Sequence, residues 1–124
     1  MAVTSPTWTE NVTLRTAATL AAGATEGHDL DLDANGYDTV TLQFNIAHSS
    51  SSGVTVNLHS SPDSGTTDDN ESLAGGFATD GTDVIKTVVV MAHAHIRVSI
   101  TNDDGSNATG NIRVLYAGRQ WETV

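Results

Sequence analysis

The sequence contains no cysteine, and this absence removes several kinds of chemistry at once. A disulfide framework, a catalytic thiol and a zinc–thiolate site all need cysteine side chains. With 124 residues, the chain has the length of one domain and can bury a sizeable apolar core. It therefore needs neither a covalent cross-link nor a metal ion to fold.

Basic residues are also scarce, with 5 Lys and Arg against 15 Asp and Glu, which gives a formal net charge of −10. Such a chain repels phosphate groups, so we expect no nucleic acid and no membrane surface among its partners. The charge instead allows docking onto a basic protein surface.

Long hydrophobic runs are missing, since no stretch approaches the ~20 apolar residues of a membrane-spanning helix. The first residues, MAVTSPTWTENV, also lack the basic start and apolar core of a signal peptide. We therefore expect the chain to be cytoplasmic when made and to leave the cell by a route other than secretion, such as assembly into a particle.

Strict alternation of apolar and polar residues is the main signal that the sequence does contain. It is clearest over Asp38–Ala47, where every second residue is apolar, as in a strand with one buried face. Similar patterns predict strands over residues 11–22, 28–33 and 54–59. A weak strand, broken by Gly75 and Gly76, is predicted over 71–79, and the β-branched run at 84–91 predicts a further strand. Ile96–Thr101 and Ile112–Tyr116 also alternate, and the polar segment between them predicts a long β-hairpin.

About eight short strands at regular spacing are typical of an all-β fold. We predict an antiparallel two-sheet sandwich that is jelly-roll-like, with an immunoglobulin-like sandwich as the second choice. The domain would span residues 12–117, between an N-terminal arm of non-strand structure at 1–11 and a C-terminal tail at 118–124. The predicted core comprises Val40, Leu42, Phe44, Ile46, Val54, Val56, Leu58, Ile96, Val98, Ile100, Ile112 and Val114.

His93 and His95 form the most enzyme-like pattern, because two histidines at this spacing share one face of a strand, as metal ligands do in cupin-type jelly rolls. A cupin motif would place a glutamate a few residues later, but residues 96–101 contain no carboxylate. Arg97 would share the histidines' face and repel a cation. We therefore interpret the pair as solvated or interface histidines and expect no cofactor or metal there.

Two acidic patterns suggest calcium without meeting its requirements. Residues 29–35 resemble the start of an EF-hand loop, but Ala34 stands where glycine is needed and Val40 where glutamate is needed. A second cluster of acidic residues lies at 63–71, and calcium binding by this cluster is kept as an alternative. No Ser–His–Asp arrangement and no phosphate-binding glycine loop is recognisable, so we assign no catalytic residue and predict that the protein is not an enzyme.

Three segments together carry a family resemblance: DTVTLQFNIA, VTVNLHSSPDSG and the closing HIRVSITNDDGSNATGNIRVLYAGR. Over residues 28–119 the chain resembles small β-sandwich virion proteins of tailed bacteriophages. The resemblance implies a non-enzymatic particle protein located in the virion. It implies either a capsid decoration (cement) protein or a head–tail or tail adaptor.

We predict a capsid decoration protein that stabilises the phage head, with the major capsid protein or another virion protein as its partner. A symmetric homo-oligomer, such as a trimer, would fit this role. The alternative is a receptor- or carbohydrate-binding module of a phage tail, which the small number of aromatic residues disfavours. Tryptophan is enriched at interface anchors; the predicted interface residues are Trp8, Trp121, Arg119, His93 and His95.

Overall fold

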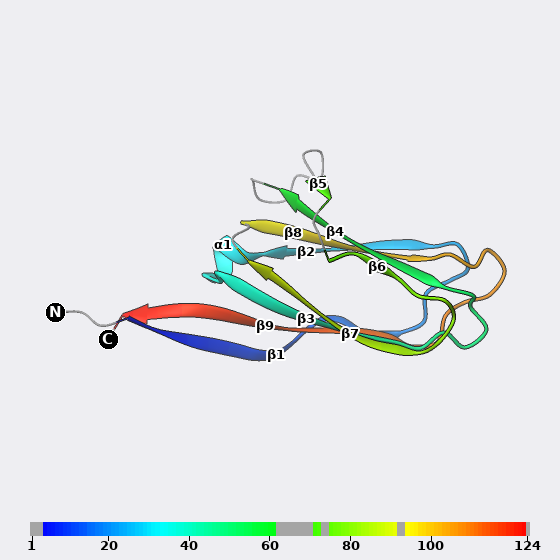
Figure 1. The fold of residues 1–124 in the computed structure, drawn as a ribbon, viewed down its shortest axis with the longest axis horizontal. Helices are drawn as coiled ribbons and strands as arrows, with labels where there is room; N and C mark the ends of the chain where they lie inside the picture. Colours follow the sequence, from blue (N-terminus) through cyan, green and yellow to red (C-terminus); the bar gives the residue numbers. More distant parts are fainter. Residues whose placement is uncertain (1–3, 62–70, 73–74, 92–93, 124) are drawn as a thin grey trace.

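The computed structural model describes residues 4–61, 71–72, 75–91 and 94–123. Two sheets face each other across the molecule, and the two chain ends lie together at one end (Figure 1). No helix among these residues is long and apolar enough to cross a membrane. The elements are β1 (Thr4–Ala18), β2 (Thr25–Asp31), α1 (Leu32–Asn35), β3 (Thr39–Ile46), β4 (Val54–Ser61), β5 (Glu71–Ser72), β6 (Phe77–Ala78), β7 (Val84–Met91), β8 (His95–Asn102) and β9 (Ile112–Thr123).

The strand order is that of a jelly roll. The first sheet runs β1-β9-β3-β7, and the second runs β2-β8-β4-β5, with the short β6 also paired to β4. All of these pairs are antiparallel. Successive strands alternate between the two sheets, except that β4, β5 and β6 share the second, and this is the double Greek-key arrangement of a jelly roll. The predicted all-β antiparallel sandwich is confirmed.

The core lies between the sheets and contains all twelve residues predicted for it, each no more than 2 % exposed. Phe44 from β3 meets Phe77 from β6 edge-to-face, with ring centroids 5.3 Å apart and planes at 75°. Offset and edge-to-face pairs are the favourable aromatic geometries, so this contact adds to the area that both rings bury. The core also contains residues outside that prediction: Leu20, Leu30, Leu32, Val88 and Val90.

The predicted hairpin between residues 96 and 116 is wrong. β8 lies between β2 and β4 in the second sheet, whereas β9 lies between β1 and β3 in the first. Alternation specifies which face of a strand is buried, but not which strand lies beside it. The segment from Asp103 to Asn111 is longer than a tight hairpin turn of 2–5 residues, and it spans the ~10 Å between packed sheets.

The linker between β8 and β9 is fixed by side-chain hydrogen bonds. The Asn102 amide donates to the carbonyl oxygens of Leu20 and Ala21 at 3.2 Å and of Asn107 at 2.8 Å. Asp104 accepts backbone N–H groups of Ser106 and Asn107 at 2.8 and 3.1 Å. These hydrogen bonds to its charged form, the Ser106 bond foremost, lower the pKa of Asp104 to about 2.

The expectation of a non-strand arm at residues 1–11 is also wrong, because β1 begins at Thr4. It pairs with β9, which continues to Thr123, so the predicted C-terminal tail is a strand as well. The ends of these strands pair through their backbone groups, and alternating hydrophobicity is a poor guide to such segments. The division into a domain at 12–117 and two tails stays a prediction.

The acidic segment after Gly27 differs from the predicted strand over 28–33. The strand ends at Asp31, whose side chain caps a single helical turn by accepting the Ala34 N–H at 2.8 Å. Gly36 ends that turn with φ of 71°, the left-handed conformation that glycine adopts readily. Leu30 and Leu32 are both buried, as the alternation predicted.

Candidate functional site

The ends of β1 and β9 form a two-stranded ribbon that extends beyond the sandwich (Figure 1). We call residues 4–9 with 118–123 the terminal ribbon. On the β9 side of the ribbon, only Gly118 and Arg119 also pair with β3, so the tip beyond them has no third strand among the described residues. An isolated two-stranded ribbon is marginally stable in water, which makes this segment a candidate for contact with a partner.

Two polar contacts fix the base of the terminal ribbon on the sandwich. Arg119 donates from Nε and Nη2 to the two Asp38 carboxylate oxygens, at 2.9 and 3.2 Å. These hydrogen bonds raise the pKa of Arg119, so the guanidinium stays charged. Gln120 donates from Nε2 to the Asn35 carbonyl oxygen at 2.6 Å. Arg119, one of the predicted interface residues, therefore pairs within its own chain.

A shallow groove of about 420 Å³ crosses the outer face of the first sheet, next to the ribbon. Trp8 is 45 % exposed at one end of this groove. Hydrogen-bonding side chains from β1 and β3 lie beside it. Its lining residues are Trp8, Glu10, Asn11, Thr41, Gln43, Leu115, Tyr116 and Ala117.

Sequence reasoning singled out Trp8 but missed the groove. Glu10, Gln43 and Leu115 come from strands that are far apart in the sequence, and only the β1-β9-β3 order brings them together. The bulge between Thr9 and Val12, with Asn11 at φ of 54°, redirects β1 beside the groove. No local motif indicates such a bulge.

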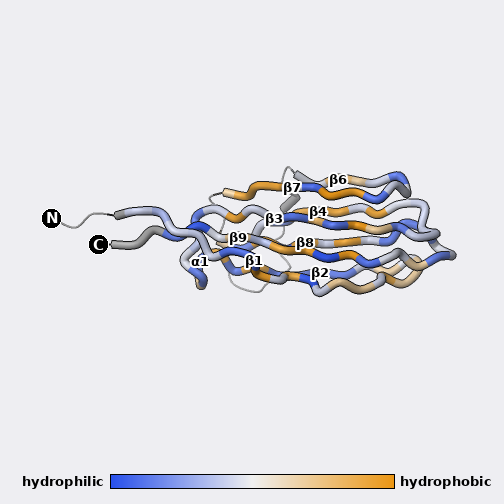
Figure 2. Tube along the Cα trace, turned by 90° about the horizontal axis from the view of Figure 1, so that it is seen from below, coloured by the Kyte–Doolittle hydropathy of each residue, from blue (hydrophilic) through white to orange (hydrophobic). Residues whose placement is uncertain are grey.

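A second feature of the same sheet is an exposed apolar stripe on β7. Ile85, Val89 and Met91 are 65 %, 56 % and 62 % exposed, and they alternate with Val88 and Val90 of the core. We call these three residues the β7 stripe. Figure 2 shows β7 among the hydrophobic segments at one side of the molecule. Neighbouring exposed apolar side chains on a strand are typical of an interaction surface.

Charge is distributed unevenly between the two sheets. β3 and β7 contain no carboxylate, whereas β2 carries Glu26, Asp29 and Asp31. Arg15 of β1 is 6 % exposed and donates to Glu26 at 2.7 Å, and this hydrogen bond lowers the pKa of Glu26. The outer face formed by β3 and β7 is therefore free of negative side chains in a strongly acidic protein.

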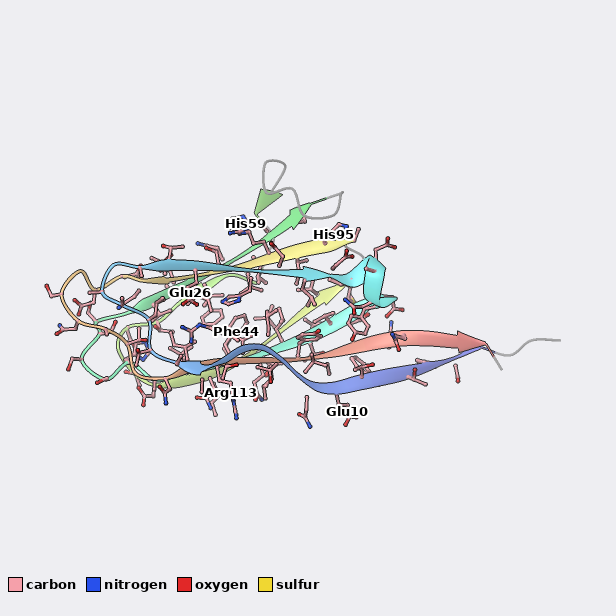
Figure 3. The ribbon with its side chains drawn as sticks, turned by 180° about the vertical axis from the view of Figure 1, so that it is seen from behind. Glu10, Glu26, Phe44, His59, His95 and Arg113 are labelled. Atoms are coloured by element: carbon pink, nitrogen blue, oxygen red, sulfur yellow. The ribbon has the colours of Figure 1, made fainter. Side chains whose placement is uncertain are left out.

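His95 lies in the other sheet from the terminal ribbon. His95 begins β8, and its Nδ1 lies 3.2 Å from Asp31 Oδ1. Figure 3 shows His95 beside α1. His93 and the side chain of Trp121 lie outside the described residues. In the described part of the chain, no group of three or more His, Asp or Glu residues could hold a metal ion.

The described residues of the acidic patterns have structural roles. Asp29 lies 3.5 Å from Arg97 across the β2–β8 pair, and Asp31 caps α1. The residues of the second cluster, Asp63, Asp68 and Asp69, lie outside the described residues, as does the Glu71 side chain.

Comparison with known proteins shows a shared fold and no family. No family model and no curated protein sequence matches the chain. The SPBc2 prophage-derived protein YomS has a similar structure, with a TM-score of 0.52 and 14 % identity over 95 % of this chain and 97 % of that one. A family 16 carbohydrate-binding module aligns with a TM-score of 0.49 and 15 % identity, covering 87 % of this chain and 75 % of that one. A cellulose-specific module, CBM28, aligns at 0.48 and 12 %, covering 93 % and 87 %.

A prophage-derived protein is thus among the proteins that share this β-sandwich. At such identity, the likeness establishes architecture only, and the same architecture supports many functions.

Proposed function

We propose that the protein is a non-enzymatic structural component of a bacteriophage particle, and that it decorates the capsid as a cement protein. The observation that supports this best is Trp8, a large apolar side chain that is 45 % exposed at the base of a projecting ribbon. Tryptophan contributes large buried area with few rotatable bonds, so it commonly anchors interfaces. The sequence resemblance to small phage virion proteins points in the same direction.

In this proposal, the terminal ribbon and the adjoining groove dock on a capsid subunit. The Arg119–Asp38 pair and the Gln120–Asn35 hydrogen bond hold the ribbon rigid at its base. A preorganised ribbon loses less conformational entropy on docking than a disordered arm would. The partner's groups would complete the ribbon edge and cover Trp8.

The test uses Trp8 as its own reporter. A Trp121→Phe background leaves Trp8 as the sole tryptophan of the chain. Adding bare capsids should shift its emission to shorter wavelength, because docking removes the indole from water. Trp8→Ala should lower occupancy of the particle, whereas Asn57→Ala, exposed on β4 of the other sheet, should leave it unchanged.

The copy number then distinguishes locations on the particle. Many copies spread over the head would support decoration, and a few copies at one vertex would favour a tail or head–tail adaptor. The proposed docking would be overturned if the Trp8→Ala variant occupied the particle as fully as the wild type does and the single-tryptophan protein showed no emission shift.

A carbohydrate-binding function is the second candidate, and the groove is the observation that favours it. An exposed indole beside Thr41, Gln43 and Glu10 offers a stacking surface together with hydrogen-bonding groups. Titration with soluble oligosaccharides would test it through the same Trp8 emission. Saturable binding that Gln43→Ala weakens would support this candidate over decoration.

A further inference from the structure

In the described part of the chain the two sheets have four edges: β1 and β7 in the first, and β2 and the two-residue strands β5 and β6 in the second. An edge strand presents unpaired N–H and C=O groups, which are a template for pairing with another chain. Proteins usually protect such edges with bulges, proline, charged side chains or very short strands. The four edges of this molecule differ in how far they are protected.

Three of the edges have such protection. β1 has register shifts at three positions, and it contains Pro6, which has no N–H to donate. β2 carries the carboxylates of Glu26, Asp29 and Asp31. β5 is only two residues long.

The β7 edge lacks these devices. It is eight residues long and pairs with β3 in unbroken register from Thr39↔Met91 to Ile46↔Val84. It contains neither proline nor a carboxylate, and its one charged residue, Lys86, lies with its ammonium 6.0 Å from the centre of the Phe77 ring. Phe77 packs on the core side, so Lys86 does not charge the outward face of the stripe.

We propose that β7 is the contact between two copies of this chain. In this dimer, the β7 strands pair antiparallel across a two-fold axis perpendicular to the first sheet, so the sheet continues from one copy into the other. In a two-fold contact both copies use the same surface, so the β7 stripe of one copy lies beside the β7 stripe of the other. The backbone groups of the edge that no described strand pairs gain partners in the same step.

Charge favours a second copy at this position. Each copy has a formal net charge of −10, so two copies repel unless they meet where carboxylates are absent. β3 and β7 form such a surface. Pairing of β7 with the β1 edge of another copy, which would build a head-to-tail ring, meets the bulges and Pro6 of that edge.

The geometry also limits the register. Residues opposite each other in an antiparallel pair share a face, so the exposed positions of one strand oppose exposed positions of the other. Two registers meet this condition with equal overlap of β7 (Val84–Met91). One sets Val88 opposite the partner's Val88 and Ile85 opposite the partner's Met91, and the other sets Thr87 opposite the partner's Thr87 and Ile85 opposite the partner's Val89.

The inference goes beyond the proposed function, because pairing through β7 needs no capsid. It predicts that the purified full chain is a dimer in sedimentation equilibrium, with a monomer fraction that grows on dilution. Val89→Lys should raise the dimer dissociation constant at least about tenfold, because it places a like charge from each copy in the contact. Thr13→Lys is the matched control, since it adds the same charge to an exposed position on β1 and should leave the dimer intact.

Circular dichroism of both variants verifies that they fold, and hydrogen exchange of the wild type gives a readout that needs no variant. Amides of β7 should exchange more slowly at high protein concentration than at low, whereas those of β2 should not change. A wild type that is monomeric at every concentration, or trimeric, would overturn the inference. Equal dimerisation of the two lysine variants, or β7 exchange independent of concentration, would overturn it as well. A monomer that still occupies capsids would leave the proposed function standing.

Discussion

Replacing Asn102 with aspartate should destabilise the fold by ~3–5 kcal/mol, because its amide joins three loops inside the protein. Asn102 is 1 % exposed at the end of β8. Its two N–H groups serve the carbonyl oxygens of Leu20, Ala21 and Asn107. The substitution is nearly isosteric, so it changes hydrogen bonding and charge without leaving a cavity.

The magnitude follows from what each side-chain atom does. The oxygen of Asn102 accepts from Ser51 Oγ at 2.7 Å and from the Asp104 N–H at 3.1 Å, and a carboxylate can keep both contacts. The nitrogen has no replacement. Loss of two donors removes ~1–3 kcal/mol of net hydrogen bonding, and the carbonyl oxygens then face a buried negative charge without a partner. Removing one partner from a buried charged arrangement costs ~3–5 kcal/mol in measured cases, which gives the upper part of the range.

Chemical denaturation at neutral pH measures this loss, with Asn111→Asp as the control. Asn111 is exposed just before β9, so its substitution adds the same charge to the chain without burying it. The difference between the two variants therefore isolates the buried site from the general effect of a more negative protein. The control should lie within ~0.5 kcal/mol of the wild type.

The loss of stability caused by Asn102→Asp should depend on pH. Burial disfavours the charged form, so the introduced carboxyl holds its proton more tightly in the folded chain than in the unfolded one. Its penalty is therefore absent below the unfolded pKa of ~3.9 and grows as the pH rises above that value. The gap between Asn102→Asp and Asn111→Asp should narrow as the pH falls toward ~4. A loss below ~1 kcal/mol, or a gap that does not depend on pH, would refute the reasoning.

Three further outcomes are expected. Phe44→Ala should cost ~3–5 kcal/mol in urea unfolding, because a fully buried ring leaves a cavity; a loss below ~1 kcal/mol would contradict the placement of β3. Asp104→Asn should be less stable at neutral pH, and its deficit should close between pH ~4 and pH ~2, because the lowered pKa of Asp104 contributes stability that acid removes. Gly118→Ala should lower the melting temperature, since a Cβ there would lie 2.5 Å from Tyr37 ring atoms. Gly105→Ala is its control, with nothing within 4 Å, and equal melting temperatures would contradict the packing of Tyr37 on the ribbon base.

The candidate interaction surface was accessible to sequence reasoning only in part. Trp8 was a recognisable anchor because a large apolar residue stood in a polar segment. The β7 stripe was not recognisable, since Val84–Met91 has apolar residues on both faces of the strand, so alternation marks neither face as the buried one. The packing of the two sheets decides that Val88 and Val90 face the core and that Ile85, Val89 and Met91 are exposed.

Alternation alone determined which side chains form the core. It placed Val40, Phe44 and Ile112 inside, because a period of two leaves only one way to bury a strand's apolar face. Local chemistry also indicates the turn at Asn35 and Gly36, because these two residue types adopt positive φ readily. The jelly-roll class followed from the number and spacing of the strands.

Tertiary structure decided which strands are neighbours. β8 and β9 lie next to each other in sequence but in opposite sheets, and β1 and β9 pair although they lie at opposite ends of the chain. Antiparallel pairing depends on backbone groups that every residue carries, so no local pattern names the partner. The terminal ribbon, the groove at Trp8 and the open β7 edge all follow from that strand order, and for this reason the sequence specified the core but not the surface through which the protein would act.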